Sequence, residues 1–360
     1  MLELEEALKR ILPLIKPLET EMISLSNALG RYAAQPVATS VDLPPFDNSA
    51  MDGYAVVAAD LAEATADHPV PLHLIGKIAA GERFSEKLSS GHCVRIFTGS
   101  PLPNGADAVV MQEDTRVETS EPSRIWILDS VKPWENVRFR GEDIKQGATL
   151  VKPGEKLTGC RCALLAASGI TNLSVRRKPV VGVLATGSEL VEPGNTLQPG
   201  QIFESNRLGL ATFIQQSGGI PKVYPLVEDR LESTVAALQQ AFAECDAVVT
   251  SGGVSVGEFD FVKSAFEQLG GALSFWKVAV KPGKPFVFGQ LGSKYLFGLP
   301  GNPVSALVTY FLLARPALLA MQGAAHLEPV FHSATLSQSI QNRGDRRHFI
   351  RVMVDSNGVA

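Results

Sequence analysis

VVGVLA at Val180–Ala185 and AVVTS at Ala247–Ser251 are two continuous apolar stretches of strand length. Segments with the spacing of amphipathic helices lie at residues 203–216 and 231–243, and a short strand is expected at 223–227. Strands that are apolar on both faces and alternate with helices are typical of a parallel sheet covered on both sides. The sequence therefore predicts a doubly wound, mostly parallel α/β domain.

The same alternation continues toward the C-terminus. We expect a helix over residues 260–269, strands at 273–280 and 295–299, and a last helix that opens at Asn302. The α/β domain is accordingly predicted to occupy residues 178–323.

The N-terminal part of the chain has a different pattern. Short β-rich pieces such as HCVRIF, DAVVMQE and SRIWILD are separated by turn-rich pieces such as PLPNGA. They predict a small inserted β domain at residues 45–140. Helical segments at 2–15 and 159–168 flank it, so the remaining segments, 1–44 and 141–177, are expected to form one discontinuous linking domain.

The composition excludes several classes of protein. The chain carries 33 Lys and Arg against 37 Asp and Glu, a formal charge of −4, so it has no overall basic field that attracts nucleic acid. The longest apolar run, residues 304–314, is shorter than the roughly 20 residues of a bilayer span, and no signal peptide is readable. The four cysteines and six histidines lack the spacing of a zinc site or a disulfide framework. We expect a cytoplasmic protein that binds neither nucleic acid nor membrane.

A glycine-bearing turn, GLPGNPVS at residues 298–305, follows the strand at 295–299. Gly301 permits close backbone approach, Asn302 is a natural helix cap, and the backbone N–H groups near Ser305 would point outward. Such a helix start can bind an anion. Taken alone, the pattern favours an ordinary capped turn over an anion site.

A second turn, KPGKP, follows the strand LSFWKVAV. Its prolines and glycine can bring the ammonium groups of Lys281 and Lys284 to one side, where they would suit a compact tetrahedral oxyanion. Solvated surface lysines are the alternative. We favour the anion site because both lysines are predicted to lie at the same sheet edge as the GLPGNPVS turn.

Two further turns follow strands of the same sheet: TGSEL, with Thr186, Gly187 and Glu189, and SGGVSVGEFD, whose motif residues are Ser251, Gly252, Gly253 and Asp260. Backbone amides in such turns can bind phosphate, whereas carboxylates near phosphate require a cation between them. This predicts a Mg²⁺ site at Glu189 and Asp260, with Asp229 as a weaker third carboxylate. A helix cap at Asp260 and a solvated turn at Glu189 remain open alternatives.

Charged residues also gather in the predicted β domain. PPFDNSAMDGYA, which contains Asp52, precedes a strand, and Arg138, Arg140, Glu142 and Asp143 cluster where the chain leaves the domain. Hydrogen bonding within a turn would explain the first group. A partner surface or a substrate wall would explain both.

At these residues the sequence resembles the MoeA-type molybdopterin molybdenumtransferases, the molybdenum insertases that also occur as the E domain of gephyrin-like proteins. The resemblance runs through PPFDNSAMDGYA, RIFTGSPLPNGADAVVMQE, ENVRFRGEDI, ATGSEL, SGGVSVGEFD, KPGKPFVFG and GLPGNPVSA and covers nearly the whole chain. It implies a MogA-like α/β domain and insertion of molybdate into adenylated molybdopterin with release of AMP, aided by Mg²⁺. It also implies an elongated homodimer, whose cleft joins the α/β domain of one subunit to the β domain of the other.

The resemblance also assigns roles to residues. The implied functional positions are Asp52, Thr98, Arg138, Asp143, Glu189, Asp229, Asp260, Lys277 and Lys281. The pterin phosphate would bind at the turns of Thr186, Gly187, Ser251, Gly252, Gly253, Gly301 and Asn302. Molybdate would bind at Lys281, Lys284 and Ser305, and Arg346 or Arg347 resembles an oxyanion-binding arginine of the family.

Two features depart from the family pattern. Members usually carry an acidic residue where Ser188 stands, so metal binding at the TGSEL turn would rest on Glu189 alone. Residues 324–360 match only the first part of the family's C-terminal β-barrel, which predicts a partial barrel. If the chain ends there, we expect weakened capture of molybdate.

Two other functions remain as alternatives. Molybdopterin adenylyltransferases, which are also possible partners, are similar to the α/β domain, but they typically carry a TGGxGP-type turn where this chain has SGGVSVGEFD. The second alternative is a non-enzymatic, gephyrin-like scaffold. No separate peptide-docking appendage is recognisable, so the sequence favours the insertase.

Overall fold

The computed structural model describes residues 1–79, 81–253, 261–342 and 344–359. The chain divides into two compact units. The first unit consists of Met1–Pro36, Val151–Cys162 and Asn172–Ala360, and the second of Val37–Leu150 and Ala163–Thr171.

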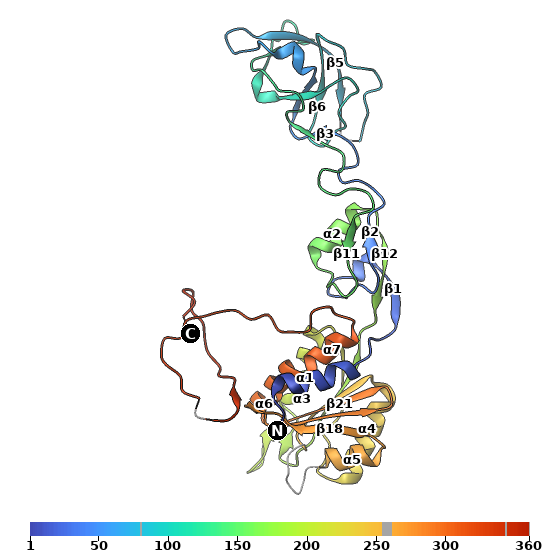
Figure 1. Cartoon of the computed structure of the whole chain (residues 1–360), viewed down its shortest axis with the longest axis vertical. Helices are drawn as coiled ribbons and strands as arrows, with labels where there is room; N and C mark the ends of the chain where they lie inside the picture. Colours follow the sequence, from blue (N-terminus) through green and yellow to red (C-terminus); the bar gives the residue numbers. More distant parts are fainter. Residues whose placement is uncertain (80, 254–260, 343, 360) are drawn as a thin grey trace. The chain divides into compact units, whose positions relative to one another are not determined.

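A six-stranded sheet forms the centre of the first unit (Figure 1). Its strand order is β16 (Ile220–Val223), β13 (Val180–Ala185), β17 (Ala247–Ser251), β21 (Lys294–Leu299), β20 (Pro285–Leu291) and β18 (Ala272–Lys277). The first four strands run parallel, whereas β20 and β18 are antiparallel to their neighbours. The predicted mostly parallel sheet is thus present, with an antiparallel edge.

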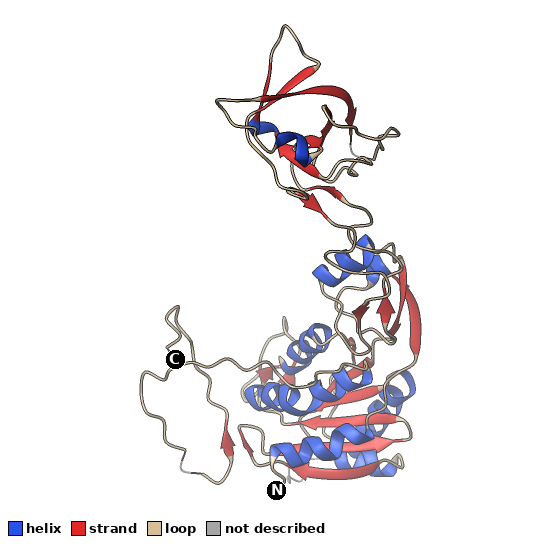
Figure 2. Ribbon diagram, turned by 45° about the horizontal axis from the view of Figure 1, so that its top comes forward, coloured by secondary structure: helices blue, strands red, loops and turns tan. Residues whose placement is uncertain are grey.

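Helices cover both faces of this sheet, so that it forms the middle layer of three (Figure 2). One face carries α1 (Leu4–Ile11), α3 (Asn206–Gln216), α6 (Pro303–Thr309), a π-helical turn (Tyr310–Ala314) and α7 (Arg315–Met321). The other face carries α4 (Leu231–Glu244) and α5 (Val262–Gln268). This arrangement explains why the central strand β13 has no polar side chain.

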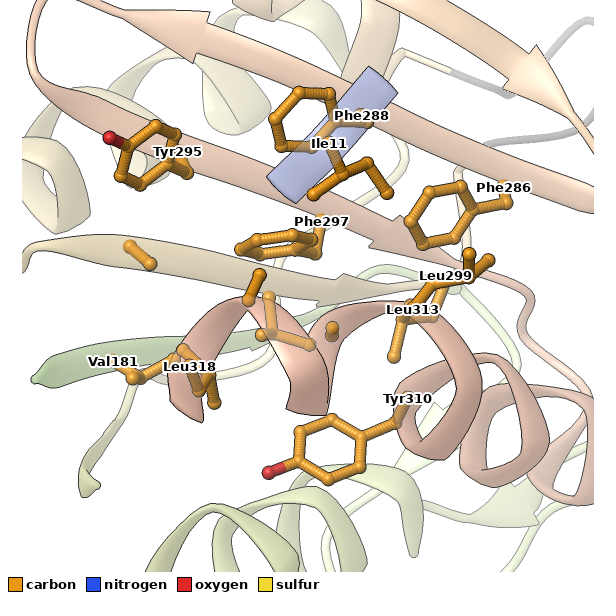
Figure 3. Packing of buried hydrophobic residues seen from close by; sticks show 14 of the residues in the cluster. Ile11, Val181, Phe286, Phe288, Tyr295, Phe297, Leu299, Tyr310, Leu313 and Leu318 are labelled. Atoms are coloured by element: carbon orange, nitrogen blue, oxygen red, sulfur yellow. The ribbon is translucent and has the colours of Figure 1, made fainter. Parts of the chain in front are cut away.

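Alternate residues of each strand enter the two cores. Phe286 and Phe288 of β20 pack on the α1 side, while Val287 between them packs on the α4 side. Figure 3 shows Ile11 of α1 among the aromatic rings of that first core. Burying a side chain of this size contributes roughly 1.5–3 kcal/mol, so the cores stabilise the sheet that carries the site.

Several elements differ from their predicted bounds. The strand expected at 223–227 lies at Ile220–Val223, because the chain enters the sheet directly after the Gly218-Gly219 turn. The helix expected at 203–216 begins at Asn206, since β15 (Ile202–Phe203) pairs with β14 (Leu190–Val191). The strand β20 was not predicted, and it begins at Pro285, the last residue of the KPGKP turn.

The strand expected at 273–280 is divided into β18 and β19 (Val280–Lys281). The helix expected at 2–15 is divided into α1 and a 3₁₀ turn at Leu12–Leu14, which contains Pro13. Its residues Leu4, Ala7 and Ile11 lie in the core of the α/β sheet. The first helix therefore belongs to the α/β layer and not to the expected linking domain, whose other boundaries stay a prediction.

Short elements complete the first unit and its connections. Strand β1 (Thr20–Ser24) pairs antiparallel with β12 (Asn172–Arg176). Strand β2 (Val37–Ala38) pairs with β11 (Thr149–Val151), and helix α2 spans Gly159–Ala167, as expected from 159–168.

The second unit contains its own six-stranded sheet. The order is β7 (Ala108–Met111), β4 (Gly53–Val56), β6 (His92–Ile96), β5 (Val70–Ile78), β9 (Arg124–Ile127) and β8 (Thr115–Val117). Beside it, β3 (Asn48–Ser49) pairs with β10 (Val137–Arg138). The sheet lies inside the range predicted for the β domain, and Leu61, Leu72 and Ile125 are part of its core.

Residues 324–359 carry little regular structure. Strand β22 (Arg347–His348) pairs parallel with β19, and Thr335 forms an isolated bridge with Val359. The described residues of this segment do not close into a barrel, so the expected partial barrel is not confirmed. Its apolar side chains are largely exposed, for example Met353 at 92%.

One helical stretch of the described chain, Pro303–Met321, is long and apolar enough to cross a membrane by length and composition. Of this stretch, 61% is buried inside the protein, and its own residues Ala306, Tyr310 and Leu318 are part of the core. The same length and composition are found in core helices of globular domains, and this stretch packs as one.

Candidate active site

The turns after three neighbouring strands meet at one edge of the α/β sheet. The parallel register places Ala185 of β13 beside Ser251 of β17, and Ser251 beside Leu299 of β21. The Thr186 amide donates to the Ser251 carbonyl at 3.1 Å, and the Gly252 amide donates to the Leu299 carbonyl at 3.1 Å. The carboxyl ends of parallel strands are where open α/β sheets bind ligands.

Glycine is required at this meeting point. Gly252 has a φ of +89°, and a Cβ atom there would lie 2.5 Å from the Thr186 carbonyl oxygen. Gly253 has a φ of +66°, and its Cβ would lie 2.9 Å from the Thr186 hydroxyl. The backbones therefore approach more closely than any side chain permits.

A first hollow of about 50 Å³ lies among these turns. Thr186, Glu189, Ser251 and Gly301 line it, together with residues of β15. Thr186 is only 8% exposed, and its hydroxyl has no hydrogen-bond partner among the residues that the structure describes. The Glu189 side chain is exposed. These predicted residues thus come together.

Asn206, which the sequence reasoning missed, lies at the same place. Its side-chain nitrogen Nδ2 donates to the Ser251 hydroxyl at 2.6 Å and to the Gly301 carbonyl at 2.7 Å. Asn206 is the first residue of α3, and the expected helix start at residue 203 concealed it inside the helix. Because Glu204 and Ser205 separate Asn206 from β15, only the correct start of α3 would have marked it.

A second hollow, of about 370 Å³, is lined by Gly187, Ser188 and Asp229. The backbone amide of Ser188 donates to Asp229 Oδ2 at 2.8 Å, and the Ser188 hydroxyl donates to the same oxygen at 3.1 Å. Adjacent residues of the TGSEL turn therefore line two separate hollows. Ser188 occupies the position where the resemblance led us to expect a second carboxylate, and it binds Asp229 as a neutral donor.

A third hollow, of about 410 Å³, joins the KPGKP turn to the start of α6. Lys281, Asn302 and Val304 line it with the tail residues His348 and Arg351, which the sequence reasoning did not single out. Gly283, at φ +112°, lies so close to α6 that a Cβ would be 2.5 Å from Thr309 Cγ2. As predicted, Asn302 caps the helix, accepting from the Ser305 amide at 3.4 Å.

Six predicted residues of the α/β unit that the structure describes do not line these three hollows: Gly252, Gly253, Lys277, Lys284, Ser305 and Arg346. The Lys277 carbonyl, at the end of β18, accepts from the Leu2 amide at 3.1 Å, and the Lys284 carbonyl, within the KPGKP turn, accepts from the Val278 amide at 3.1 Å. Ser305 is in the first turn of α6, and Arg346 directly precedes β22.

The alternative arginine of the tail is engaged elsewhere. Arg347 forms an ion pair with Glu5 of α1. Asp260 lies outside the described residues. Within the described ranges, no group of three His, Cys, Asp or Glu side chains is placed to hold a metal.

In the second unit, Asp52 and Thr98 form one pair. The Thr98 amide and hydroxyl both donate to Asp52 Oδ1 at 2.8 Å. These hydrogen bonds, the backbone one first, lower the pKa of the Asp52 carboxyl below its ordinary value. The carboxylate is therefore held ionised and in a fixed orientation.

Arg138 forms a second group in that unit. Its guanidinium donates to Glu142 and to Asp143, each at 2.6 Å. The hydrogen bond from Arg138 is the main cause of the lowered pKa of Glu142. The predicted residues Arg138 and Asp143 are thus directly paired, and both are largely exposed.

Comparison with known proteins identifies the family. Residues 2–169 match the model of the MoeA N-terminal region (domains I and II), and residues 182–320 match that of a probable molybdopterin-binding domain. The molybdopterin molybdenumtransferase of Haemophilus influenzae is 40% identical over 353 residues, which cover 98% of this chain and 85% of that protein. The chain belongs to the molybdopterin molybdenumtransferase family.

Other members give the same result. The molybdopterin molybdenumtransferase of Bacillus subtilis is 34% identical over 351 residues, 97% of this chain and 82% of that protein. The crystal structure of the molybdopterin biosynthesis MoeA protein from Pyrococcus horikoshii OT3 aligns with a TM-score of 0.83 at 33% identity, covering 100% of this chain and 89% of that one. The MoeA-like fold, with its mixed sheets and α/β domain, is thereby confirmed.

Proposed function

We propose that this protein inserts molybdate into adenylated molybdopterin during molybdenum cofactor biosynthesis and releases AMP. The observation that carries the proposal is the meeting of the Thr186, Ser251 and Gly301 turns at one sheet edge, beside the hollow that Lys281 shares with Asn302. Relatives at 34–40% identity that are named molybdopterin molybdenumtransferases support it.

The pterin phosphate binds at the turns that end the parallel strands. Backbone amides in tight glycine turns and at the start of α6 offer hydrogen bonds to an anion without a competing side chain. The buried, unpartnered hydroxyl of Thr186 is a further donor at this position. The hollow there is small, about 50 Å³, and so suits one phosphate group better than a whole pterin ring.

Molybdate binds in the third hollow. Lys281 supplies a compact positive charge, and Asn302 and the first turn of α6 lie on the opposite wall. Lys284, Ser305 and Arg346 are close in sequence to residues that line this hollow and complete the set. Molybdate and pterin phosphate then bind on either side of the Gly301-Asn302 turn, which brings the two substrates together.

Mg²⁺ fits the donors at the TGSEL turn. The exposed Glu189 carboxylate shares a hollow with Thr186 and Gly301, and the Asp229 carboxylate lies at the same turn. A cation that keeps several waters and takes one or two carboxylates plus phosphates needs no larger cluster. The bound ion would neutralise charge on the phosphates of the substrate. Lys277 and Asp260 are the remaining proposed functional residues of the α/β unit.

The second unit contributes Asp52, Thr98, Arg138 and Asp143 to a homodimer. We place these residues at a site completed by the α/β domain of the other subunit. The enzyme works in the cytoplasm, where a molybdopterin adenylyltransferase supplies its substrate. Because relatives of the whole chain are named molybdenumtransferases, this function is preferred to that of an adenylyltransferase or a scaffold.

The test is to incubate the protein with adenylated molybdopterin, molybdate and Mg²⁺ and to follow AMP release. The double change Lys281→Ala/Lys284→Ala should raise the molybdate concentration needed for half-maximal rate by about thirtyfold, because each of the two lost charge contacts contributes roughly 1 kcal/mol. Lys178→Ala is the control, since this exposed lysine precedes β13 at the opposite sheet edge.

Absence of AMP release from the unchanged protein would refute the proposal. Formation of adenylated molybdopterin from ATP and molybdopterin would assign the adenylyltransferase function instead. An unaltered molybdate requirement in the double variant would remove the lysines from the site.

A further inference from the structure

The Asn206 side chain connects two turns that are far apart in the sequence. Its Nδ2 atom is 2.6 Å from the Ser251 hydroxyl, after β17, and 2.7 Å from the Gly301 carbonyl, after β21. Both distances are short for hydrogen bonds donated by an amide nitrogen. Asn206 itself begins α3, so three elements of the α/β layer meet at one side chain.

The chemistry of the acceptors fixes the orientation of this amide. The Gly301 carbonyl can only accept, so the nitrogen and not the oxygen of Asn206 must face it. The Ser251 hydroxyl donates its own hydrogen to the Pro300 carbonyl at 3.3 Å and therefore accepts the second N–H of Asn206. Both side-chain N–H groups of Asn206 are thus used, and no isosteric residue can replace it.

The contacts lie at the anion-binding edge and not in the remote core. Ser251 is only 1% exposed, while Gly301 is exposed, and both line the first hollow with Asn206. Gly301 directly precedes Asn302, the cap of α6. A hydrogen bond to the Gly301 carbonyl therefore restrains the peptide from which α6 starts.

We propose that Asn206 is a positioning residue that clamps the Ser251 and Gly301 turns in the geometry that binds the substrate phosphate. The proposal deepens the function proposed above and rests on it. Without the clamp, the turn can move away from the sheet edge, so the amides at the start of α6 no longer converge on one anion. The loss falls on binding of the pterin substrate, since Asn206 does not itself contact the reacting atoms.

The decisive variants are Asn206→Asp and Asn206→Ala. Asn206→Asp keeps the shape, removes both donors and places a carboxylate against the Gly301 carbonyl. We expect KM for adenylated molybdopterin to rise by about tenfold or more, because two hydrogen bonds contribute roughly 0.5–1.5 kcal/mol each. kcat should change by less than about threefold, because Asn206 does not contact the reacting atoms. Asn195→Asp is the matched control, because Asn195 is exposed in the turn between β14 and β15.

A double-variant cycle with Ser251→Ala separates a clamp from two independent contacts. If Asn206 acts through Ser251, the Asn206→Ala/Ser251→Ala protein should have a KM close to that of the worse single variant. Independent effects would multiply instead. Multiplicative effects would overturn the clamp.

A second measurement does not depend on activity. In the full chain, Asn206→Asp and Asn206→Ala should speed amide hydrogen exchange in peptides that cover residues 247–253 and 298–306, while Asn195→Asp leaves both unchanged. Unchanged exchange in both Asn206 variants would refute the clamp. The two proposals can also fail separately. If exchange is faster in the folded Asn206 variants but the wild-type protein releases no AMP, the proposed function is refuted and the clamp remains.

Discussion

The two units present their predicted functional residues in different ways. In the α/β unit, the turns of Thr186, Ser251 and Gly301 come together through backbone contacts at the ends of parallel strands. In the second unit, Asp52 is paired with Thr98, and Arg138 with Asp143, through exposed side chains.

The α/β unit thus presents backbone groups, whereas the second unit presents paired side chains. The α/β edge offers backbone amides whose positions depend on glycine and on the sheet register. In the second unit, Arg138 and Asp143 pair within one turn, whereas Asp52 and Thr98 meet where β4 pairs with β6 and bind each other through a charged side chain. We therefore expect the α/β edge to be sensitive to changes in shape, and the pairs to be sensitive to changes in charge and pH.

The largest expected effect comes from giving a side chain to Gly252. Gly252→Ala places a Cβ 2.5 Å from the Thr186 carbonyl oxygen at a φ of +89°. It should lower the free energy of unfolding of the α/β unit by about 3 kcal/mol, from combined backbone strain and overpacking. The measurement is urea unfolding of the full chain.

Gly99→Ala is the matched change in the second unit. Gly99 has a similar φ of +82°, but its Cβ would meet nothing within 4 Å. Only the backbone strain of about 1 kcal/mol remains. Equal losses in the two variants would show that close approach at the α/β edge is not the sensitive feature.

A smaller effect is expected when Ser188 becomes acidic. Ser188→Asp would replace a donor to Asp229 with a second negative charge. In the presence of EDTA, the free energy of unfolding should fall by about 1 kcal/mol, because the two carboxylates repel each other. Added Mg²⁺ should restore part of that loss in Ser188→Asp. It should do much less for Ser188→Ala, and equal responses to Mg²⁺ would argue against a cation site at this turn.

The smallest effect concerns Asp52. Thr98→Val removes the hydroxyl hydrogen bond to Asp52 Oδ1, so the pKa of Asp52 should move upward toward its ordinary value. A lowered pKa contributes stability above the ordinary value of 3.8, and this stability is lost as the pH falls through the folded-state value. Wild-type protein should thus lose slightly more stability than Thr98→Val on acidification below about pH 4. Carboxyl NMR titration gives the pKa directly, and an unshifted resonance would contradict the assignment.

The sequence predicts those parts of the fold that depend on local pattern. Val180–Ala185 and Ala247–Ser251 have the predicted bounds, because strands buried on both faces are rich in apolar residues. The edge strand Ile220–Val223 was placed too late, since two of its apolar side chains, Ile220 and Val223, are exposed and give no clear pattern. The partial barrel expected in the tail, which residues 324–342 and 344–359 do not confirm, likewise depends on pairing partners that local sequence does not reveal.

The candidate site follows the same rule. The sequence predicts that Thr186, Ser251 and Gly301 lie together, because turns after parallel strands share one sheet edge. It does not predict the positions of Asn206, His348 and Arg351, because their contacts depend on where α3 begins and on how the tail pairs with β19. Asp260 lies outside the described residues, and its role stays a prediction.

The packing of α1 has a consequence for how the protein is made. Leu4 and Ile11 are synthesised long before their neighbours Phe286, Phe288 and Phe297. The hydroxyl of Tyr295 also donates to the Leu14 carbonyl at 2.9 Å. The apolar face of α1 therefore stays exposed until these later strands have been synthesised. The α1 side of the α/β layer can be completed only after the strands that carry Phe286, Phe288 and Phe297 have been synthesised.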